Sequence, residues 1–426
     1  MIPIQETLQL PVAGLSGFEP PLTEEESAVQ QSAHRFAKEV LRPIGRELDR
    51  MSSEDAIAPG SPYWNVFAEA AKLGLDPSFF AQFEPATAIK LEALIGEEMG
   101  WGDAGLATSL AAAQFPLLMA ASVGNQERIE LSTGRIGCWL ITQPDRGSDV
   151  QRMYADDWPA NTPGNKGNVT AKVTADEIVL NGQCSAWVSN GAVAQVALCY
   201  IAADYGDGFF AGDGMPNGLA CIAPLDVPGV SRGKPLEKIG QRALPQGEIY
   251  FDNVRLPRRF AVATKDQYQG NLSSAWSYAG THMCQAFTGV ARAAFEHALA
   301  YAHERKQGGV PIIEHQLTKW RLGDMARRVE LARAIARRSL EYARLSPRGH
   351  AYVTAQAKVS VTEEAMKVVH EALQLFGGNG TTREYPMEKL FRDTRAALIE
   401  DGENYMLTMR LGVLLSKLHQ DGWATG

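Results

Sequence analysis

The sequence predicts a multidomain α+β protein, with an N-terminal helical domain, a central β-barrel or β-sandwich domain and a C-terminal four-helix bundle. Apolar residues recur at helical spacing in the first and last parts of the chain, whereas they alternate in short runs in the middle. The length of 426 residues also exceeds what one hydrophobic core usually organises. We therefore expect three domains, over residues 1–137, 138–258 and 259–426.

Composition narrows the class of protein. A formal net charge of −8 argues against a broad nucleic-acid-binding surface. The five cysteines are an odd number without a CxxC pair, which indicates buried thiols and a reducing, cytoplasmic location. The sequence contains no run of about 20 apolar residues, so we expect no membrane span. The sequence contains no HExxH, His/Cys cluster or GxGxxG after a strand, so we expect neither a metal site nor a Rossmann nucleotide site.

The N-terminal domain is expected to begin with an irregular arm, residues 1–23, followed by a helix over residues 24–49. Thr23 and Glu26 have the spacing of a capping box, which satisfies free backbone N–H groups at a helix start. Further helical patterns cover residues 63–73, 86–100 and 104–122.

The β domain is predicted from short alternating runs. Residues 169–174 and 178–182 are separated by three turn residues, which is typical of a hairpin. Further strands are expected over residues 196–202, 218–225 and 248–256. Such closely spaced strands indicate a compact barrel or sandwich.

The C-terminal domain is predicted as a bundle because long apolar stripes return after residue 270. One stripe runs from Met283 to Ala298 and another from Leu322 to Leu340. A third helix precedes Gly377, and the last one runs through Leu418. Four arginines of the second helix are expected on its solvated face: Arg327, Arg328, Arg337 and Arg338.

The stretch from residue 371 to 405 carries the strongest chemical signal. Gly377, Gly378 and Gly380 break a helix and allow a ligand or a second chain to approach the backbone closely. After the next helix, two adjacent carboxylates, Glu400 and Asp401, precede Gly402. This order indicates a nucleotide cofactor beside a proton-abstracting base.

The same stretch resembles the acyl-CoA dehydrogenase family through LFGGNG (375–380), YPMEKLFRD (385–393) and the carboxylate–glycine pair eight residues later. The resemblance implies bound FAD, an acyl-CoA thioester substrate and FAD contacts at Gln374, Gly377 and Gly378. Asp401 takes the position of the family's base, which is usually Glu, and Gly402 lies at the substrate. Glu400 stays open as the alternative base.

Two strings in the β domain extend the resemblance. ITQPDRGSD (141–149) is similar to the family's TEPxAGSD, which implies that Thr142 contacts the flavin and Ser148 the acyl carrier. Gln143 and Arg146 depart from the usual Glu and Ala. NGQCSAWVSNG (181–191) resembles NGxKxWITNG. This likeness places Trp187 beside the flavin and Ser189 near flavin N5, two further cofactor contacts.

Two more strings flank the domain junction. GKPLEKIGQR (233–242) is similar to the family's MGxR segment, and Arg242 is expected either at the substrate or at the junction. ERKQGGVPIIEHQ (304–316) resembles RxxFGxxxxxxQ. It implies that Arg305 and Gln316 contact the FAD of a neighbouring subunit in a homotetramer or homodimer. Gly308 replaces the family's phenylalanine.

The reaction implied by the resemblance is α,β-dehydrogenation: the carboxylate takes the α-proton while the β-hydride passes to flavin N5. An electron-transferring flavoprotein would then reoxidise the FAD. Because Asp is one methylene shorter than Glu, we expect a bulky or non-linear acyl group.

Two alternatives remain open. A flavin oxidase of the nitroalkane oxidase type also uses an Asp base, and GVARAAFEHAL (289–299) resembles that branch. The second alternative is a non-catalytic family member that acts as a subunit. Two departures from the family pattern favour it: Gly308, and Glu403 where the family usually has Thr.

Overall fold

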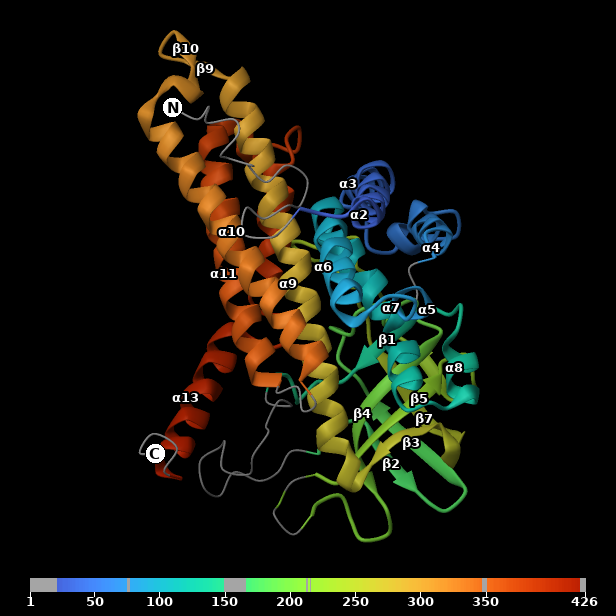
Figure 1. Ribbon diagram of the computed structural model, residues 1–426. Helices are drawn as coiled ribbons and strands as arrows, with labels where there is room; N and C mark the ends of the chain where they lie inside the picture. Colours follow the sequence, from blue (N-terminus) through green and yellow to red (C-terminus); the bar gives the residue numbers. More distant parts are fainter. Residues whose placement is uncertain are drawn as a thin grey trace.

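The computed structural model describes residues 21–74, 77–148, 166–211, 214, 216–346 and 351–421. Most of the expected N-terminal arm, residues 1–20, lies outside them. Within the described residues a helical region, a β-sheet and a set of long helices follow one another along the chain, as expected (Figure 1). The predicted fold class is therefore confirmed.

The first region is helical from residue 24 to 132. Its helices are α2 (Glu24–Phe36), α3 (Arg42–Leu48), α4 (Pro62–Lys72), α5 (Pro77–Phe80), α6 (Pro85–Gly102), α7 (Ala104–Ser122) and α8 (Gln126–Ser132). A π-helical segment (Ala37–Leu41) joins α2 to α3, and a 3-10 turn (Asp55–Ile57) precedes α4. The expected capping box is present: the Glu26 amide donates to Thr23 Oγ1, and the Thr23 amide donates to Glu26 Oε2.

The β domain is one eight-stranded sheet. Its strands are β1 (Gly137–Leu140), β2 (Thr170–Val173), β3 (Glu177–Gln183), β4 (Val196–Asp204), β5 (Gly218–Pro224), β6 (Val230–Arg232), β7 (Ile249–Pro257) and β8 (Ala261–Thr264). The strand order is β6-β7-β3-β2-β4-β5-β8, and β1 pairs in parallel with β4. The predicted hairpin is confirmed as the antiparallel β2–β3 pair, in which Thr170 lies opposite Asn181.

Strand β4 is a continuous apolar run because both of its faces are buried. Ala197, Cys199 and Ile201 belong to the core inside the sheet. The alternate residues Val196, Leu198 and Tyr200 pack with side chains of α7 and α9. The sheet is thereby fixed against both helical regions.

The C-terminal region contains three long helices that lie side by side (Figure 1): α9 (Lys265–Glu304), α10 (Gln316–Leu345) and α11 (Ala351–Phe376). A short hairpin of β9 (Lys306–Gln307) and β10 (Val310–Pro311) joins α9 to α10, and 3-10 turns cover Arg258–Phe260, Ile312–Glu314 and Gly377–Thr381. The chain ends in α12 (Met387–Ala397), which packs on α11 and α9, and α13 (Asn404–Gln420), which contacts α11 and extends away from the bundle.

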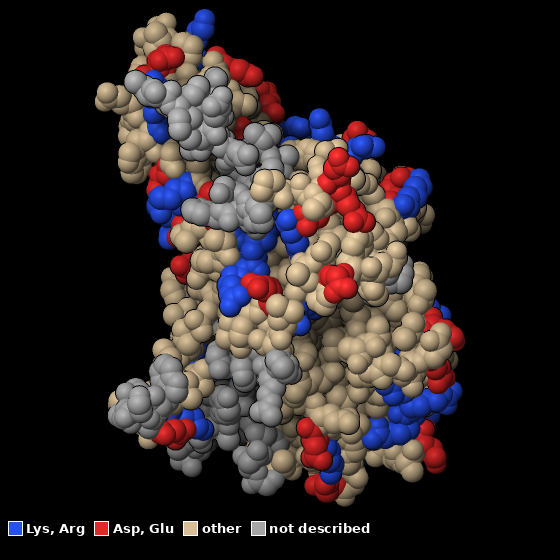
Figure 2. Space-filling view, viewed as in Figure 1, with Lys and Arg blue, Asp and Glu red and all other residues tan. Residues whose placement is uncertain are grey.

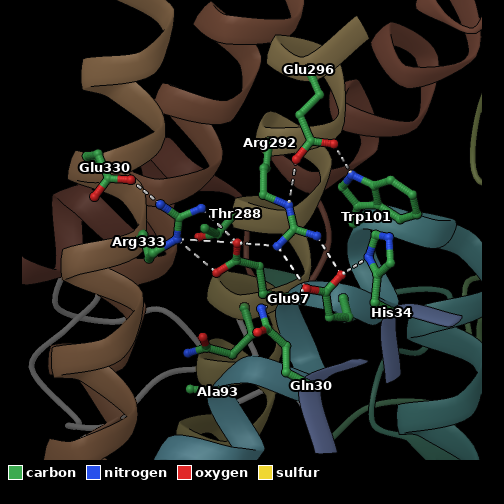
Figure 3. A network of polar contacts seen from close by, with 12 residues as sticks. Gln30, His34, Ala93, Glu97, Trp101, Thr288, Arg292, Glu296, Glu330 and Arg333 are labelled. Atoms are coloured by element: carbon green, nitrogen blue, oxygen red, sulfur yellow. Dashed lines mark hydrogen bonds and ion pairs between the residues drawn. The ribbon is translucent and has the colours of Figure 1, made fainter. Parts of the chain in front are cut away.

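The N-terminal region is locked to the bundle by close approach of α6 and α9. A Cβ on Gly100 would come within 1.9 Å of the Ala286 carbonyl oxygen, and one on Gly289 within 2.0 Å of the Glu97 carbonyl oxygen. Glycine is therefore required at both contacts. Glu97 and Glu98 of α6 consequently reach Arg292 of α9, and Glu97 also reaches Arg333 of α10 (Figure 3).

Three further expectations from the sequence concern surface charge, metal binding and membrane insertion. Acidic and basic side chains are interspersed on the face shown in Figure 2. Among the described residues, no three or more His, Cys, Asp and Glu side chains are grouped as a metal site would require. In the same part of the chain, α7 alone has the length and apolar composition of a membrane-crossing helix, and more than half of its most apolar stretch is buried in the protein.

Candidate active site

The corner between α12 and α13 places a carboxylate on a strained backbone. Asp401 has φ = +51°, in the left-handed region that non-glycine residues rarely occupy, and Gly402 has φ = +96°. The Asn404 amide closes the corner by donating to the Leu398 carbonyl over 3.0 Å. Glu403 then begins α13, because its carboxylate accepts from the Met406 amide. Strained residues of this kind cluster at functional sites.

A buried lysine lies beneath this corner. Lys358 on α11 is fully buried, and its ammonium donates to the Gly402 carbonyl and to Asn404 Oδ1, each over 2.8 Å. Asn404 Nδ2 in turn donates to Thr362 Oγ1 over 3.1 Å. Burial lowers the pKa of Lys358 to about 8, and the charges of Asp401 and Glu400 oppose that shift. The corner is thus held from below by a cation that stays protonated at neutral pH.

The two adjacent carboxyl groups differ in their electrostatics. Burial raises the pKa of Asp401 to about 6, against the opposing charge of Lys358. Burial and the neighbouring Asp401 charge raise the pKa of Glu400 to about 7. Gln241 Nε2 donates a short hydrogen bond to Glu400 Oε1. At neutral pH Asp401 is therefore the group more often ionised, and Glu400 is directed toward the β domain.

Helix α12 joins the corner to all three regions. Asp393 accepts from the Gln241 amide over 2.5 Å and from Lys389 Nζ over 2.5 Å. Lys389 also donates to Asp103, at the start of α7, over 2.6 Å. A Cβ on Gly240 would come within 2.2 Å of the Arg392 carbonyl oxygen, so this glycine lets the β-domain loop lie directly on α12.

The β-domain residues of the resemblance are joined to one another by backbone and side-chain contacts. The Ser185 amide donates to the Thr142 carbonyl over 3.0 Å, which ties the two strings together. Ser189 pairs with Gln246, whose side-chain amide donates to the Trp187 carbonyl over 3.0 Å. The Trp187 side chain is 60% exposed, an unusual position for an indole.

A second buried lysine continues this chain of contacts. Lys238 Nζ donates to Gln246 Oε1 over 2.7 Å and to the Leu244 carbonyl over 2.7 Å. Burial lowers its pKa to about 8, and the Glu400 charge opposes the shift. Lys238 thus links the Trp187 segment, through Gln246, to the charges of Glu400 and Asp393.

Ser148 and Arg242, the expected substrate contacts, have different surroundings. Ser148 Oγ accepts from the Glu403 amide over 3.1 Å, two residues from Asp401. Arg242 donates to the carbonyls of Asp49, Met51 and Lys238 and pairs with Glu237. These contacts place Arg242 at the junction of α3 with the β domain, one of the two expected positions.

The remaining expected cofactor residues lie at the opposite end of the bundle. Arg305 is the C-cap of α9, 21 residues beyond Cys284, which corresponds to about 32 Å along the helix. Gln316 begins α10, and the turn from Gln374 to Gly378 follows α11 at the same end (Figure 1). These five residues are all exposed: Arg305, Gln316, Gln374, Gly377 and Gly378. Within one chain the structure does not bring them near Thr142, Trp187 or Asp401.

Sequence reasoning missed Lys358, Lys238 and Gln241. A usable signal existed for Lys358, which follows Ala357 and precedes Val361 and Ala365 on one buried stripe. A lysine inside an apolar helical stripe needs a buried partner. The contact between Gln241 and Glu400 joins residues 159 positions apart, and no local pattern encodes it.

Comparisons with known proteins identify the family of the chain. Family models of the acyl-CoA dehydrogenase middle domain and C-terminal domain match residues 138–254 and 278–413, together more than half of the chain. A probable acyl-CoA dehydrogenase, YngJ of Bacillus subtilis (strain 168), is 29% identical over 92% of this chain and 97% of its own length. Benzylmalonyl-CoA dehydrogenase of Aromatoleum aromaticum is 28% identical over 91% of this chain and 97% of its own.

Solved structures share the fold. The glutaryl-coenzyme A dehydrogenase–glutaryl-CoA complex superimposes with a TM-score of 0.79 at 23% identity, over 95% of this chain and 97% of that one. Butyryl-CoA dehydrogenase from Megasphaera elsdenii gives 0.77 at 24% identity, over 93% and 100%. These structures share the fold, and the two family models, which together match more than half of the chain, show that it belongs to the acyl-CoA dehydrogenase family of FAD-dependent oxidoreductases.

Proposed function

We propose that this protein catalyses the α,β-dehydrogenation of an acyl-CoA thioester, with Asp401 as the base. The observation that carries the proposal is the corner itself. A half-buried carboxylate stands on a left-handed backbone, supported by Lys358 and bonded through Glu403 to Ser148. A carboxyl group with a pKa of about 6 is ionised at neutral pH and still basic enough to accept a proton.

The β-domain surface fits a flavin. Trp187 presents an exposed indole that a flat aromatic ring would cover, and the neighbouring Thr142 and Ser189 supply hydroxyl groups. These three residues would hold the isoalloxazine part of FAD, which when bound supplies the hydride acceptor of the reaction. The Gln246–Lys238 contacts fix the Trp187 segment in position.

The two carboxyl groups have different roles in this proposal. Asp401 receives the α-proton because it is the more acidic of the pair and therefore the ionised one near neutral pH. Glu400 holds the corner to the β domain through Gln241. Lys358 orients the corner and limits the rise of the Asp401 pKa.

A bulky acyl group remains the proposed substrate. The shorter Asp side chain moves the carboxylate back, and reaction geometry is sensitive to such shifts. Relatives named for a benzylmalonyl and a cyclohexene-carbonyl thioester support this choice. The test is a panel of linear, branched, alicyclic and aromatic acyl-CoAs under anaerobic conditions, with flavin bleaching as the signal. Purified protein that is colourless and takes up no added FAD would overturn the proposal.

We further propose that a second subunit completes the FAD site. Arg305 and the Gly377–Gly378 turn lie at the far end of the bundle, with Arg305 about 32 Å along α9 from Cys284, whereas Trp187 belongs to the β domain. Two large apolar side chains next to Gln316, Leu317 and Trp320, are 61% and 65% exposed, which is typical of a contact surface. Arg305→Ala should lower both FAD retention and the mass measured by light scattering; a fully flavinylated monomer would contradict this.

An oxidase of the nitroalkane oxidase type is the second candidate, because its base is also Asp. Mixing the reduced enzyme with dioxygen separates the two: slow reoxidation that an electron-transferring flavoprotein accelerates supports the dehydrogenase. Rapid reoxidation by dioxygen alone supports the oxidase. A non-catalytic role has less support, since Glu403, one departure from the family pattern, serves as the N-cap of α13.

A further inference from the structure

The turn after β1 holds two side chains on one face. The Gln143 amide donates to the Arg146 carbonyl over 2.8 Å, and the Arg146 amide donates to the Gln143 carbonyl over 3.1 Å. The two residues thus form an isolated antiparallel bridge. Residues opposite each other in such a bridge project their side chains to the same side, with Cβ atoms about 4.5–5.5 Å apart. Gln143 and Arg146 therefore leave the turn together.

Both side chains are buried and carry unused donors. Gln143 is 2% exposed and Arg146 is 8% exposed. The Val169 amide donates to Gln143 Oε1 over 2.7 Å, which leaves Nε2 available. Within the part of the chain that the structure describes, neither Gln143 Nε2 nor Arg146 Nη1 has a hydrogen-bond partner, and Arg146 forms no ion pair.

An unpaired guanidinium in the interior is costly, because taking a charge out of water is offset only by a counter-charge and hydrogen bonds. Buried polar groups in native proteins almost always have partners. Two convergent donors, one of them cationic, match the oxygens of an anion. Gln143 and Arg146 are also the two positions at which this chain departs from the family string TEPxAGSD, which has Glu and Ala there.

The position of the pair relative to the base indicates which part of a substrate would reach it. Ser148, two residues later, contacts Glu403 beside Asp401. In the other direction, the Arg146 charge acts on the Tyr268 phenol at the start of α9 and opposes the rise that burial causes in its pKa. Arg146 therefore stands two residues from the contact with the Asp401 corner and on the side of the turn that meets Tyr268, so an anion at Arg146 would lie beside the corner.

We propose that Gln143 and Arg146 bind a phosphate ester on the carrier arm of the thioester substrate. This inference rests on the proposed acyl-thioester function and adds a determinant of carrier recognition to it. In CoA and in the phosphopantetheine arm of a carrier protein, the thioester lies at one end and a phosphate ester at the other. A planar guanidinium with a neighbouring carboxamide N–H binds such a group through several hydrogen bonds.

The test compares pantetheine with 4′-phosphopantetheine, which differ by one phosphate, in calorimetric titrations of the FAD-loaded protein. Wild type should bind phosphopantetheine about 10-fold or more tightly than pantetheine, the effect of one good charge-assisted hydrogen bond. Arg146→Gln, which removes the charge and leaves a carboxamide, should abolish that preference without changing the binding of pantetheine. Arg255→Gln is the matched control, since Arg255 lies in the same domain, exposed and paired with Glu177.

A third ligand, CoA, separates the two sources of phosphate. Equal affinities for CoA and phosphopantetheine would assign the site to the phosphate next to pantetheine, which CoA and carrier proteins share. Tighter binding of CoA that Arg146→Gln removes would assign it to the nucleotide phosphates. Either result supports the proposal.

Two results would overturn the proposal. One is a phosphate preference that survives in Arg146→Gln, and the other is a loss of FAD from that variant, which would assign the pair to the cofactor. The proposed function fails separately, if no acyl-CoA bleaches the wild-type flavin. Because the titrations use unacylated ligands, they decide the carrier site in either case.

Discussion

Two buried clusters of charge in this protein contain the same kinds of groups and have opposite electrostatics. Glu97 is fully buried and pairs with Arg292 and Arg333 in the network of Figure 3. It also pairs with Arg337. At the 400–404 corner, Glu400 and Asp401 share the nearby charge of Lys358. Burial alone would raise the pKa of Glu97, but its three arginines outweigh burial and hold the pKa well below its usual range. The pKa values of Glu400 and Asp401 are raised.

The difference lies in how many cations act on each carboxylate: three guanidinium groups lower the pKa of Glu97, whereas Lys358 opposes the rise at Asp401 and Lys358 and Lys238 oppose it at Glu400. Three guanidinium groups fix Glu97 as a permanent anion, and it then serves as a rigid joint between α6, α9 and α10. The ammonium groups of Lys358 and Lys238 do not outweigh burial at the two carboxyl groups, so their pKa values of about 6 and about 7 lie where a proton can be gained or lost near neutral pH. Burial therefore gives a structural joint in one place and a titrating site in the other.

Replacing the base should have the largest effect. Asp401→Asn keeps the size of the side chain and removes its basicity, so we expect turnover to fall by roughly 10²–10⁴-fold or more. FAD content and ligand binding should be unchanged, because the hydrogen bonds from Lys358 to the Gly402 carbonyl and to Asn404, which hold the corner, remain in this variant. Single-turnover flavin reduction measures the effect. Full activity in Asp401→Asn would leave this mechanism without its base.

Breaking the permanent network should act on stability. Glu97→Gln removes the buried anion that Arg292, Arg333 and Arg337 share, and we expect a loss of about 3–5 kcal/mol in the free energy of unfolding. Arg292 keeps Glu98 and Arg333 keeps Glu330, so the network is weakened and not abolished. Denaturant titration of the FAD-loaded protein provides the measurement. Arg338→Gln is the control, because Arg338 pairs with Glu341 on the exposed face of α10, where a change of stability should be small. If both variants unfold alike, the network does not join the regions.

Removing the shared cation should shift the pH dependence. Lys358 opposes the rise of the Asp401 pKa, so Lys358→Met should move that pKa above its value of about 6. The ionised base forms as pH rises through its pKa, and the ascending limb of the pH–rate profile should therefore move to higher pH. Loss of the Gly402 and Asn404 hydrogen bonds should also lower the rate at the plateau. Lys367→Met, on the exposed face of α11, is the control, and an unshifted profile in Lys358→Met would show that the lysine acts on stability alone.

The two clusters also mark what sequence could predict. The capping box at Thr23, the β2–β3 hairpin and the long helices follow from patterns within a few residues, and these predictions are confirmed. The expectation that Arg337 lies on a solvated face is wrong, because it donates to Glu97, 240 positions away, over 2.8 Å. Periodicity assigns a face to a helix; which second helix covers that face depends on the close glycine contacts of α6 with α9.

The sequence likewise predicted some residues of the candidate site and missed others. Family strings identified Asp401, Thr142, Trp187 and Ser189, and the structure places the last three in one connected surface. The roles of these residues stay predictions. The electrostatic partners that set the carboxyl pKa values, Lys358 above all, come from another helix and belong to no string. These partners act on the carboxyl groups only because folding brings α11 next to the corner that contains Asp401.

The smallest expected effect tests whether the two carboxyl groups divide their roles. Glu400 has a pKa of about 7, raised by burial and by the Asp401 charge, so it carries a proton in a large share of molecules at neutral pH. Glu400→Gln reproduces the uncharged form and keeps an acceptor for Gln241 Nε2. We therefore expect less than about a 10-fold loss of activity, below the range for removal of a general base. The pH–rate profile should also lose any dependence that comes from titration of Glu400. If Glu400→Gln loses turnover while Asp401→Asn retains it, the base is Glu400, and Asp401 is the residue that supports it.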